Sequence, residues 1–256
     1  MHKLERKKLI IELLENNGFI KISDLYKNKK LKNISPMTIN RDLNAMKKEG
    51  ILETVWGGIQ IPGYNFWTTQ ETSREEKTQI SIIEKNKIAK IAGEKIIEND
   101  VIFIGTGTTL EEIVNFLNGK NVTVVTNSHF IALNCYKYSN ITLILIGGRL
   151  RKKSGAYVGE LANKNIKTLH FNHCFIGANG IDYNGIYNSN LEEGTINEIV
   201  LNNSKNRYIL VTNDKFNKTD FVQFYSIKNI HCVITDKEIE TEKFLSHNSN
   251  LKFIIT

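Results

Sequence analysis

Between Ser35 and Gly50, the sequence gathers side chains that suit contacts with a nucleic acid. Arginine and asparagine can bond base edges through two hydrogen bonds, whereas lysine and threonine suit phosphate groups. At helical spacing these residues share the front and flanks of one helix, which predicts a recognition helix. An ordinary amphipathic surface helix is the alternative for this stretch taken alone. The candidate DNA-contacting residues are Ser35, Met37, Thr38, Asn40, Arg41, Asn44 and Lys48, with Trp56 and Gly57 in the segment that follows.

A second group of small, hydroxylated and basic residues follows apolar stretches typical of β-strands. Backbone N–H groups, hydroxyls and the start of a helix together suit a phosphate or another anion. The loop at 105–109 matches neither the P-loop nor Gly-x-Gly-x-x-Gly, so a nucleotide is not indicated. Tight turns without a ligand, and a solvated loop at 149–153, are the alternatives. The candidate anion-binding residues are Gly105, Thr106, Gly107, Thr108, Thr109, Thr126, Asn127, Ser128, Gly147, Gly148, Arg149, Gly177, Asn179 and Lys215.

Three helices must position the first group. Apolar periodicity predicts a helix over 3–16, an extended entry at 19–22 and a second helix capped by Ser23. In the third helix, Ser35 is a good N-cap and Gly50 can end the helix, while one apolar stripe faces the core. The β-branched residues around Gly57-Gly58 then predict a two-stranded wing. The predicted domain is a winged helix-turn-helix over 1–61, followed by a linker over 62–73. The stripe consists of Ile39, Leu43 and Met46.

Positive charge is concentrated in the N-terminal part of the chain. Residues 1–63 hold 12 lysines and arginines and 7 acidic residues, so they carry most of the formal net charge of +7. Neutralisation of phosphates supplies much of the affinity of DNA-binding domains. The charge distribution therefore fits a nucleic-acid module at the N-terminus, and it also fits a well-solvated surface.

A βα rhythm must position the second group. A long helix is predicted over 74–99, with Ile82, Ile83, Ile88, Ile91, Ala92 and Ile96 facing inward. Apolar strands follow, and small or polar residues gather at their carboxyl ends, where open α/β sheets bind ligands. The predicted fold class is therefore α/β, with a mostly parallel sheet domain over 74–256. The strands are expected at 101–104, 122–125, 141–146, 174–176, 208–211, 232–234 and 253–255.

Composition bounds the remaining function classes. Of the 256 residues, 41% are hydrophobic and 24% are charged, which is ordinary for a globular protein. We find no apolar run long enough to cross a membrane and no secretory leader, so we expect a cytoplasmic protein. Three widely spaced cysteines without a Cys-x-x-Cys motif fit a reducing compartment. No cofactor and no metal is expected.

The N-terminal part resembles the DNA-binding domain of the DeoR family of bacterial repressors. The family pattern begins with an arginine near the start of helix one, matched by Arg6, and has a Gly-Gly pair in the wing, matched by Gly57-Gly58. Asn40 stands where the family usually has arginine or histidine. The resemblance implies that this part binds DNA through the third helix. The helix-three pattern reads Ser35, Thr38, Ile39, Asn40, Arg41, Asp42 and Leu43.

The C-terminal part is similar to the DeoR effector domain, so the resemblance spans almost the whole chain. It implies a sensor fold like ribose-5-phosphate isomerase and a phosphorylated sugar or related metabolite as effector. Usual acidic or basic residues are replaced by Gly105-Thr106, Asn172, Asn197 and Thr212. The matching stretches are Gly107-Thr108-Thr109, Thr126-Asn127-Ser128, Gly147-Gly148, Phe175-Ile176-Gly177, Glu192-Glu193 and Lys215-Phe216.

The leading hypothesis is a sequence-specific transcriptional regulator, a repressor of a sugar-metabolism operon whose DNA binding is modulated by a phosphorylated metabolite. Its expected partners are a double-stranded DNA operator, the metabolite and further copies of the chain in a homodimer or homotetramer, because paired helices read paired half-sites.

Two other hypotheses compete with it. The first is a sugar-phosphate isomerase-like enzyme with an added DNA-binding domain, which needs a carboxylate base. The second is a metal sensor built on His170, His173 and Cys174, although a strand would point neighbouring residues to opposite faces. The candidate bases are Glu111, Glu112, Asp182, Glu192 and Glu193.

Overall fold

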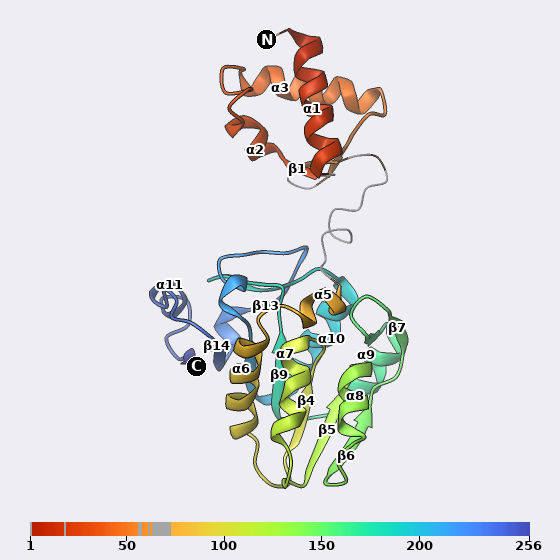
Figure 1. Ribbon diagram of the computed structural model, residues 1–256, viewed down its shortest axis with the longest axis vertical. Helices are drawn as coiled ribbons and strands as arrows, with labels where there is room; N and C mark the ends of the chain where they lie inside the picture. The colour runs from red at the N-terminus through yellow and green to blue at the C-terminus, as the bar shows by residue number, and fades with distance from the viewer. Residues whose placement is uncertain (1, 18, 56–57, 61, 63–72) are drawn as a thin grey trace. The chain divides into compact units, whose positions relative to one another are not determined.

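The computed structural model describes residues 2–17, 19–55, 58–60, 62 and 73–256. The chain divides into two compact units (Figure 1), Met1–Glu71 and Thr72–Thr256. We call them the N-terminal unit and the C-terminal unit and describe each by itself. No helix in the described ranges is long and apolar enough to cross a membrane.

The N-terminal unit packs three helices against a small antiparallel sheet. Its helices are α1 (Lys3–Asn17), α2 (Ile22–Lys27) and α3 (Pro36–Lys48). Its strands lie in the order β1 (Phe19–Lys21), β3 (Gly58–Gln60) and β2 (Glu53–Val55). The predicted two-stranded wing is the antiparallel pair β2–β3, and the predicted extended entry is β1, which pairs with β3 as a third strand. The winged helix-turn-helix architecture itself is as predicted.

Helix α3 begins as the sequence predicted. Ser35 is extended, with φ −63° and ψ 144°, and its side chain accepts a hydrogen bond from the backbone N–H of Thr38 at 3.2 Å. Ile39, Leu43 and Met46 are 1%, 3% and 1% exposed, so the predicted stripe is the buried face. This burial fixes which side of the helix faces solvent.

The C-terminal unit is built on seven parallel strands. Every predicted strand is present, and all six neighbouring pairs are parallel. Their order is β15-β14-β12-β9-β4-β5-β6. The chain leaves β4 toward β5 and β6 on one side and continues to β9, β12, β14 and β15 on the other. The bounds are β4 Val101–Ile104, β5 Val122–Thr126, β6 Ile141–Leu145, β9 Phe171–Gly177, β12 Ser204–Leu210, β14 Cys232–Thr235 and β15 Lys252–Ile255.

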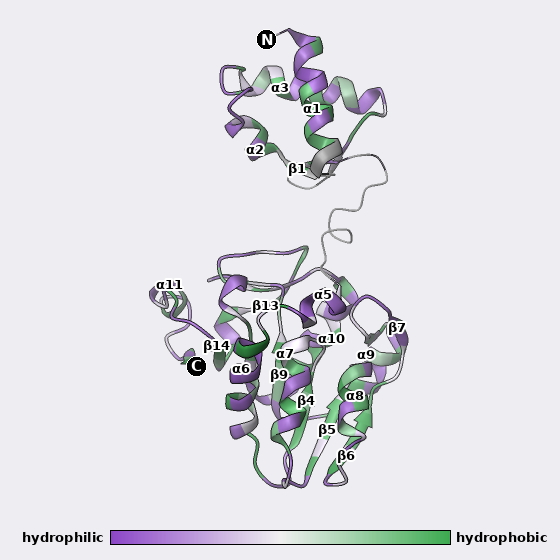
Figure 2. Cartoon of the chain, viewed as in Figure 1, coloured by the Kyte–Doolittle hydropathy of each residue, from purple (hydrophilic) through white to green (hydrophobic). Residues whose placement is uncertain are grey.

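Helices cover both faces of this sheet, and side chains alternate between two cores. Ile102 and Ile104 join the core beneath α6 (Ile82–Glu94), whereas Phe103 joins the core beneath α10. Hydrophobic colour is concentrated in the strands (Figure 2). The first core also takes α7 (Thr108–Glu111), the 3₁₀ turn η1 (Glu112–Phe116) and α8 (His129–Cys135), and the second takes α9 (Glu160–Ile166) and α10 (Leu191–Asn202).

Smaller elements surround the sheet. The hairpin of β7 (Arg149–Arg151) and β8 (Ala156–Val158) follows β6. A three-stranded antiparallel sheet has the order β10-β11-β13. The remaining bounds are β10 Gly180–Ile181, β11 Gly185–Asn188, η2 Asn213–Lys215, β13 Val222–Ser226, η3 Ile227–Asn229 and α11 Glu242–Leu245.

The helix predicted over 74–99 is wrong in extent. It is divided into α5 (Arg74–Thr78) and α6, because Ser81 takes the left-handed conformation with φ 54°. Ile82 and Ile83, predicted to face inward, are 57% and 68% exposed. A capping box formed by Ser73 and Glu76 starts α5, which thereby becomes a separate short element at the entrance to the C-terminal unit.

Candidate functional sites

The front of α3 is exposed to solvent, and most of its side chains can donate hydrogen bonds. Met37 is 82% exposed, and Asn40, Arg41, Asn44 and Lys48 are also exposed, while Thr38 is half-buried. No hydrogen bond of the Arg41 guanidinium to another described residue is found. Arginine and asparagine on an exposed face fit the base-reading positions of a recognition helix. Trp56 and Gly57, predicted to contact DNA from the wing, lie outside the described residues.

A buried ion pair holds α3 against α1. Arg6 Nε lies 2.6 Å from Asp42 Oδ2, and the two side chains are 9% and 3% exposed. Removing one partner of such a pair leaves a buried charge uncompensated and costs about 3–5 kcal/mol. Arg6 and Asp42, which both belong to the family pattern, are therefore explained by the packing of α3 on α1.

Polar contacts also fix the flanks of α3. Asn40 Oδ1 accepts a hydrogen bond from the Tyr26 hydroxyl of α2 at 2.9 Å. Lys47 Nζ donates to the Thr54 hydroxyl of β2 at 2.6 Å. The helix is thus tied to both neighbours, which presents its front as a rigid surface.

In the C-terminal unit, the candidate loops meet at one edge of the sheet. Because all seven strands are parallel, the loops after β12, β9, β4, β5 and β6 lie side by side in that order. The connection after β4 leads to one side of the sheet, and the connection after β9 leads to the other side. The loops at 105–109 and 177–179 therefore flank a topological switch point. Ligands of open α/β sheets bind at such a point.

The Gly-Thr loop lies directly beside the loop after β9. Gly105 N–H donates to Phe175 O at 3.0 Å, and a Cβ on Gly177 would lie 3.6 Å from Thr106 O. Gly107 has φ 143°, which favours glycine at the start of α7. In the described part of the chain, the hydroxyls of Thr106, Thr108 and Thr109 have no hydrogen-bond partner. Thr106 and Thr109 are half-buried and Thr108 is buried, so the first two hydroxyls are the more accessible to a ligand.

The Thr126-Asn127-Ser128 turn has mostly internal partners. The Thr126 hydroxyl donates to Ile104 O at 2.6 Å, and Ser128 Oγ accepts from Ile131 N–H at 3.3 Å as the cap of α8. Asn127 Nδ2 donates to Tyr157 O at 3.1 Å. Asn127 Oδ1 is buried with no partner among the described residues. The side chains of this turn thus mainly hold the turn in place, and Asn127 Oδ1 is the acceptor that has no partner among the described residues.

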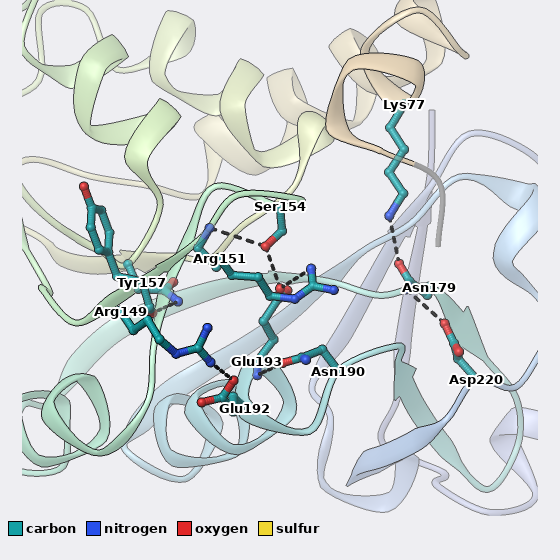
Figure 3. A network of polar contacts seen from close by, with 12 residues as sticks. Lys77, Arg149, Arg151, Ser154, Tyr157, Asn179, Asn190, Glu192, Glu193 and Asp220 are labelled. Carbon is teal, nitrogen blue, oxygen red and sulfur yellow. Dashed lines mark hydrogen bonds and ion pairs between the residues drawn. The ribbon is translucent and has the colours of Figure 1, made fainter. Parts of the chain in front are cut away.

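Acidic residues of α10 pair with the arginines that follow β6 (Figure 3). Arg149 pairs with Glu192, and Arg151 Nη1 lies 3.1 Å from Glu193 Oε1. Ser154 Oγ donates to the same Glu193 oxygen at 2.6 Å. The predicted cation Arg149 therefore already has a carboxylate partner, unlike the threonines of the Gly-Thr loop. Gly148 leaves no room for a side chain, because its Cβ would lie 2.8 Å from Val158 O, whereas Gly147 faces open space.

Three lysines gather at the strand-end edge, two of which the sequence did not single out. Lys215 Nζ lies 2.8 Å from Asp214 Oδ2. Lys77 Nζ donates to Asn179 Oδ1 at 3.3 Å, and Asn179 Nδ2 donates to Asp220 Oδ2 at 2.9 Å (Figure 3).

Lys85 is the buried member of this lysine group, and it donates to the carbonyl of Lys77. It is only 9% exposed. Burial lowers the pKa of Lys85, and the charges of Lys215 and Lys77 lower this pKa further, whereas the charges of Asp214 and Glu111 partly offset the effect. A charged residue on the buried stripe of α6, in line with Ile88, Ala89 and Ala92, was the signal that could have identified it.

Family models match both units. The model described as a DeoR-like helix-turn-helix domain matches residues 6–63, and the DeoR C terminal sensor domain matches residues 80–237. The chain belongs to the DeoR family.

Relatives of this DeoR-family protein match along nearly its whole length. A lactose phosphotransferase system repressor of Lactococcus lactis subsp. lactis is 34% identical over 258 residues, covering 98% of this chain and 99% of its own. Proteins of the same name from Streptococcus mutans serotype c and Staphylococcus aureus are 31% and 32% identical, covering 92% and 94% of this chain and 93% and 94% of their own.

Solved structures are more distant from the DeoR-family chain. Ribose 5 phosphate isomerase A from Neisseria gonorrhoeae has a TM-score of 0.38 and 20% identity, with 52% of each chain covered. The δ subunit of eIF2B from Chaetomium thermophilum has a TM-score of 0.47 and 15% identity, with 63% of this chain and 58% of that chain covered. The fold assignment therefore depends on the family models and the strand order.

The geometry does not favour the isomerase alternative for this DeoR-family protein. Glu111 is bound by Arg74, and Asp182 accepts from the N–H groups of Asn184 and Gly185. Glu192 and Glu193 are paired with arginines, and Glu112 accepts from Asn115 Nδ2 at 3.0 Å. Each candidate base is thus already engaged in a structural contact, and the family is one of DNA-binding regulators.

The residues proposed for a metal have other partners. His173 Nε2 lies 3.2 Å from Asp100 Oδ2, and burial lowers the pKa of His173. Cys174 is buried in the core beneath α10, and burial raises the pKa of its thiol to about 12. His170 is exposed. Across the described residues no group of three or more suitable side chains could hold a metal ion.

Proposed function

We propose that this DeoR-family regulator represses a sugar-metabolism operon and releases its operator when a phosphorylated sugar binds the C-terminal unit. The observation that carries the proposal is the lysine group Lys77, Lys85 and Lys215, whose charges act on one another at the same edge of the sheet as the Gly-Thr loop. A buried lysine close to two other lysines favours an anion, because an anion would offset the cost of desolvating the charge. A phosphoryl group supplies several acceptor oxygens for such donors.

The names of the relatives support the same class of ligand. They are named lactose phosphotransferase system repressors, and this name joins a sugar with the transfer of a phosphoryl group. We therefore propose a hexose phosphate as the ligand of this chain. We also propose that it acts in the cytoplasm, as a homodimer or homotetramer, because one recognition helix per chain reads one half-site.

A thermal-shift screen tests the ligand class. Full-length protein is heated with galactose 6-phosphate, glucose 6-phosphate, inorganic phosphate or unphosphorylated galactose. We expect a rise in Tm with at least one sugar phosphate and none with galactose, because a ligand that binds only the folded state stabilises it. A gel shift with operator DNA then checks release. A rise with galactose alone, or with none of the probes, would count against a phosphorylated sugar.

The variant Lys85→Met tests the site, with Lys87→Met as its matched control. Lys87 is exposed on the same helix, so the same change of charge is made two residues away. We expect Lys85→Met to weaken sugar-phosphate binding by about tenfold or more, as loss of a hydrogen bond to a charged group costs about 1.5–3 kcal/mol. Calorimetric titration measures the dissociation constants. Equal affinities of the two variants would remove Lys85 from the site.

A further inference from the structure

Helix α5 is the first element of the C-terminal unit, and residues 63–72 join it to the N-terminal unit. Its Arg74 side chain reaches α7, the helix that starts at the Gly-Thr loop. Arg74 Nε donates to Glu111 Oε1 at 2.8 Å, and a second guanidinium nitrogen donates to the other carboxylate oxygen. The guanidinium carbon also lies 3.5 Å from the ring centroid of Phe130 on α8. One side chain thus joins α5 to two helices beside the candidate effector site.

Further contacts tie α5 to the rest of the strand-end edge. The backbone N–H of Arg74 donates to Lys153 O at 3.3 Å, in the turn between β7 and β8. Lys77 Nζ donates to Asn179 after β9, and Lys85 Nζ of α6 donates to the carbonyl of Lys77. The helix is therefore held from both sides of the topological switch point.

Helix α5 has no buried residue of its own. Apolar burial therefore does not dock it, and its position depends on the polar contacts. Of these, the Arg74–Glu111 pair has the most sheltered geometry, with side chains 22% and 8% exposed. Its hydrogen bonds raise the pKa of Arg74, so the guanidinium stays charged. A two-point arginine–carboxylate pair fixes orientation as well as distance.

We propose that Arg74 is a positioning residue that keeps α5 docked in the C-terminal unit, that operator binding depends on this docking, and that an anion bound by Lys77 and Lys85 replaces two of the other contacts that hold α5. This proposal depends on the proposed function for the identity of the anion and for the direction of the response. The anion's oxygens accept hydrogen bonds from the same two ammonium groups that now hold α5. Because residues 63–72 lead along the chain from the N-terminal unit into α5, we expect a change in the docking of α5 to alter operator affinity.

Operator affinity of the full-length protein tests the role of Arg74. Four proteins are compared with and without galactose 6-phosphate: wild type, Arg74→Ala, the charge swap Arg74→Glu with Glu111→Arg, and Arg207→Ala. Arg207 is the control, because its guanidinium donates to the backbone carbonyls of Leu201 and Asn229 in the same unit. Melting curves of all four proteins separate loss of fold from loss of control.

Without sugar phosphate, we expect Arg74→Ala to bind the operator at least about fivefold more weakly than wild type, the lower range of allosteric coupling. Galactose 6-phosphate should change its affinity little further. The charge swap should recover most of the affinity and the response, and Arg207→Ala should keep both even if its Tm falls.

Wild-type affinity in Arg74→Ala, together with a full response, would overturn the proposal. So would a charge swap that binds the operator no better than Arg74→Ala does. If wild-type protein ignores galactose 6-phosphate, the proposed ligand fails, yet the comparison without sugar phosphate still decides whether Arg74 positions α5.

Discussion

The two units treat positive charge in opposite ways. On α3 the cations predicted to contact DNA are exposed, whereas the buried cation Arg6 pairs with Asp42 and holds α3 against α1. At the strand-end edge, the buried cation Lys85 forms no ion pair within 4 Å in the described part of the chain, and Asp214 and Glu111 act on it only from farther away. DNA is a large polyanion that meets an exposed surface, whereas a small anion reaches buried donors and replaces their water. Under the proposed function, burial of a cation stabilises the fold in the N-terminal unit and prepares a ligand site in the C-terminal unit.

Replacing the buried cation Arg6 should therefore lower the free energy of unfolding, whereas replacing the buried cation Lys85 should not. Arg6→Met leaves Asp42 buried and uncompensated, so we expect a loss of about 3–5 kcal/mol. Lys85→Met removes a charge that is costly to bury, so we expect no loss. Denaturant unfolding of the full-length protein, followed by probes in each unit, measures both.

The Lys85 comparison also has a defined pH dependence. The folded-state pKa of Lys85 is lowered, so the unfolded chain binds more protons and stability rises with pH toward the ordinary lysine value near 10.4. Any advantage of Lys85→Met should accordingly shrink as the pH approaches that value. A variant that is less stable than wild type at every pH would contradict the assignment of Lys85 to ligand binding.

Salt should weaken binding of the operator to α3 much more than binding of a sugar phosphate to the strand-end lysines. Neutralising phosphates releases counterions, so operator affinity should fall by about a hundredfold or more between 50 and 200 mM salt, following the slope of about 0.9 per phosphate contact. Binding of a sugar phosphate at partly buried lysines should fall much less, because burial reduces screening. Parallel titrations of both ligands over the same salt range check this. Equal slopes would mean that the strand-end lysines act as a surface patch.

Local patterns predicted most of the scaffold that positions both sites. The seven strands are short apolar runs ended by small residues, and the stripe of Ile39, Leu43 and Met46 set the buried face of α3. The break between α5 and α6 was missed, because Ile82 and Ile83 continue an apolar pattern even though they are exposed. Apolar periodicity does not reveal a left-handed Ser81.

The pairings across the sites could not be predicted from local patterns. Arg149 and Glu192 are 43 residues apart, and Arg74 and Glu111 are 37 apart, so only the fold brings each pair together. Arg149 was predicted to bind an anion, because its pairing with Glu192 cannot be seen in the sequence. Lys85 was overlooked because a lysine within a basic sequence looks like a solvated residue until its helix is docked on the sheet.

The smallest expected effect distinguishes base readout from phosphate contact within α3 itself. Arg41 lies on the exposed front of the helix with donors suited to a base edge, so Arg41→Ala should cost about 1–3 kcal/mol of specific binding and relax sequence preference at one position. Lys48 lies in the last turn of α3. Lys48→Ala should therefore weaken binding to all DNA sequences equally and reduce the slope of affinity against salt by about one. Binding of each variant to a library of operator sequences at two salt concentrations measures both properties. If Arg41→Ala lowers the affinity for every DNA sequence by the same factor, Arg41 contacts phosphate. Base readout must then come from other residues of the exposed face.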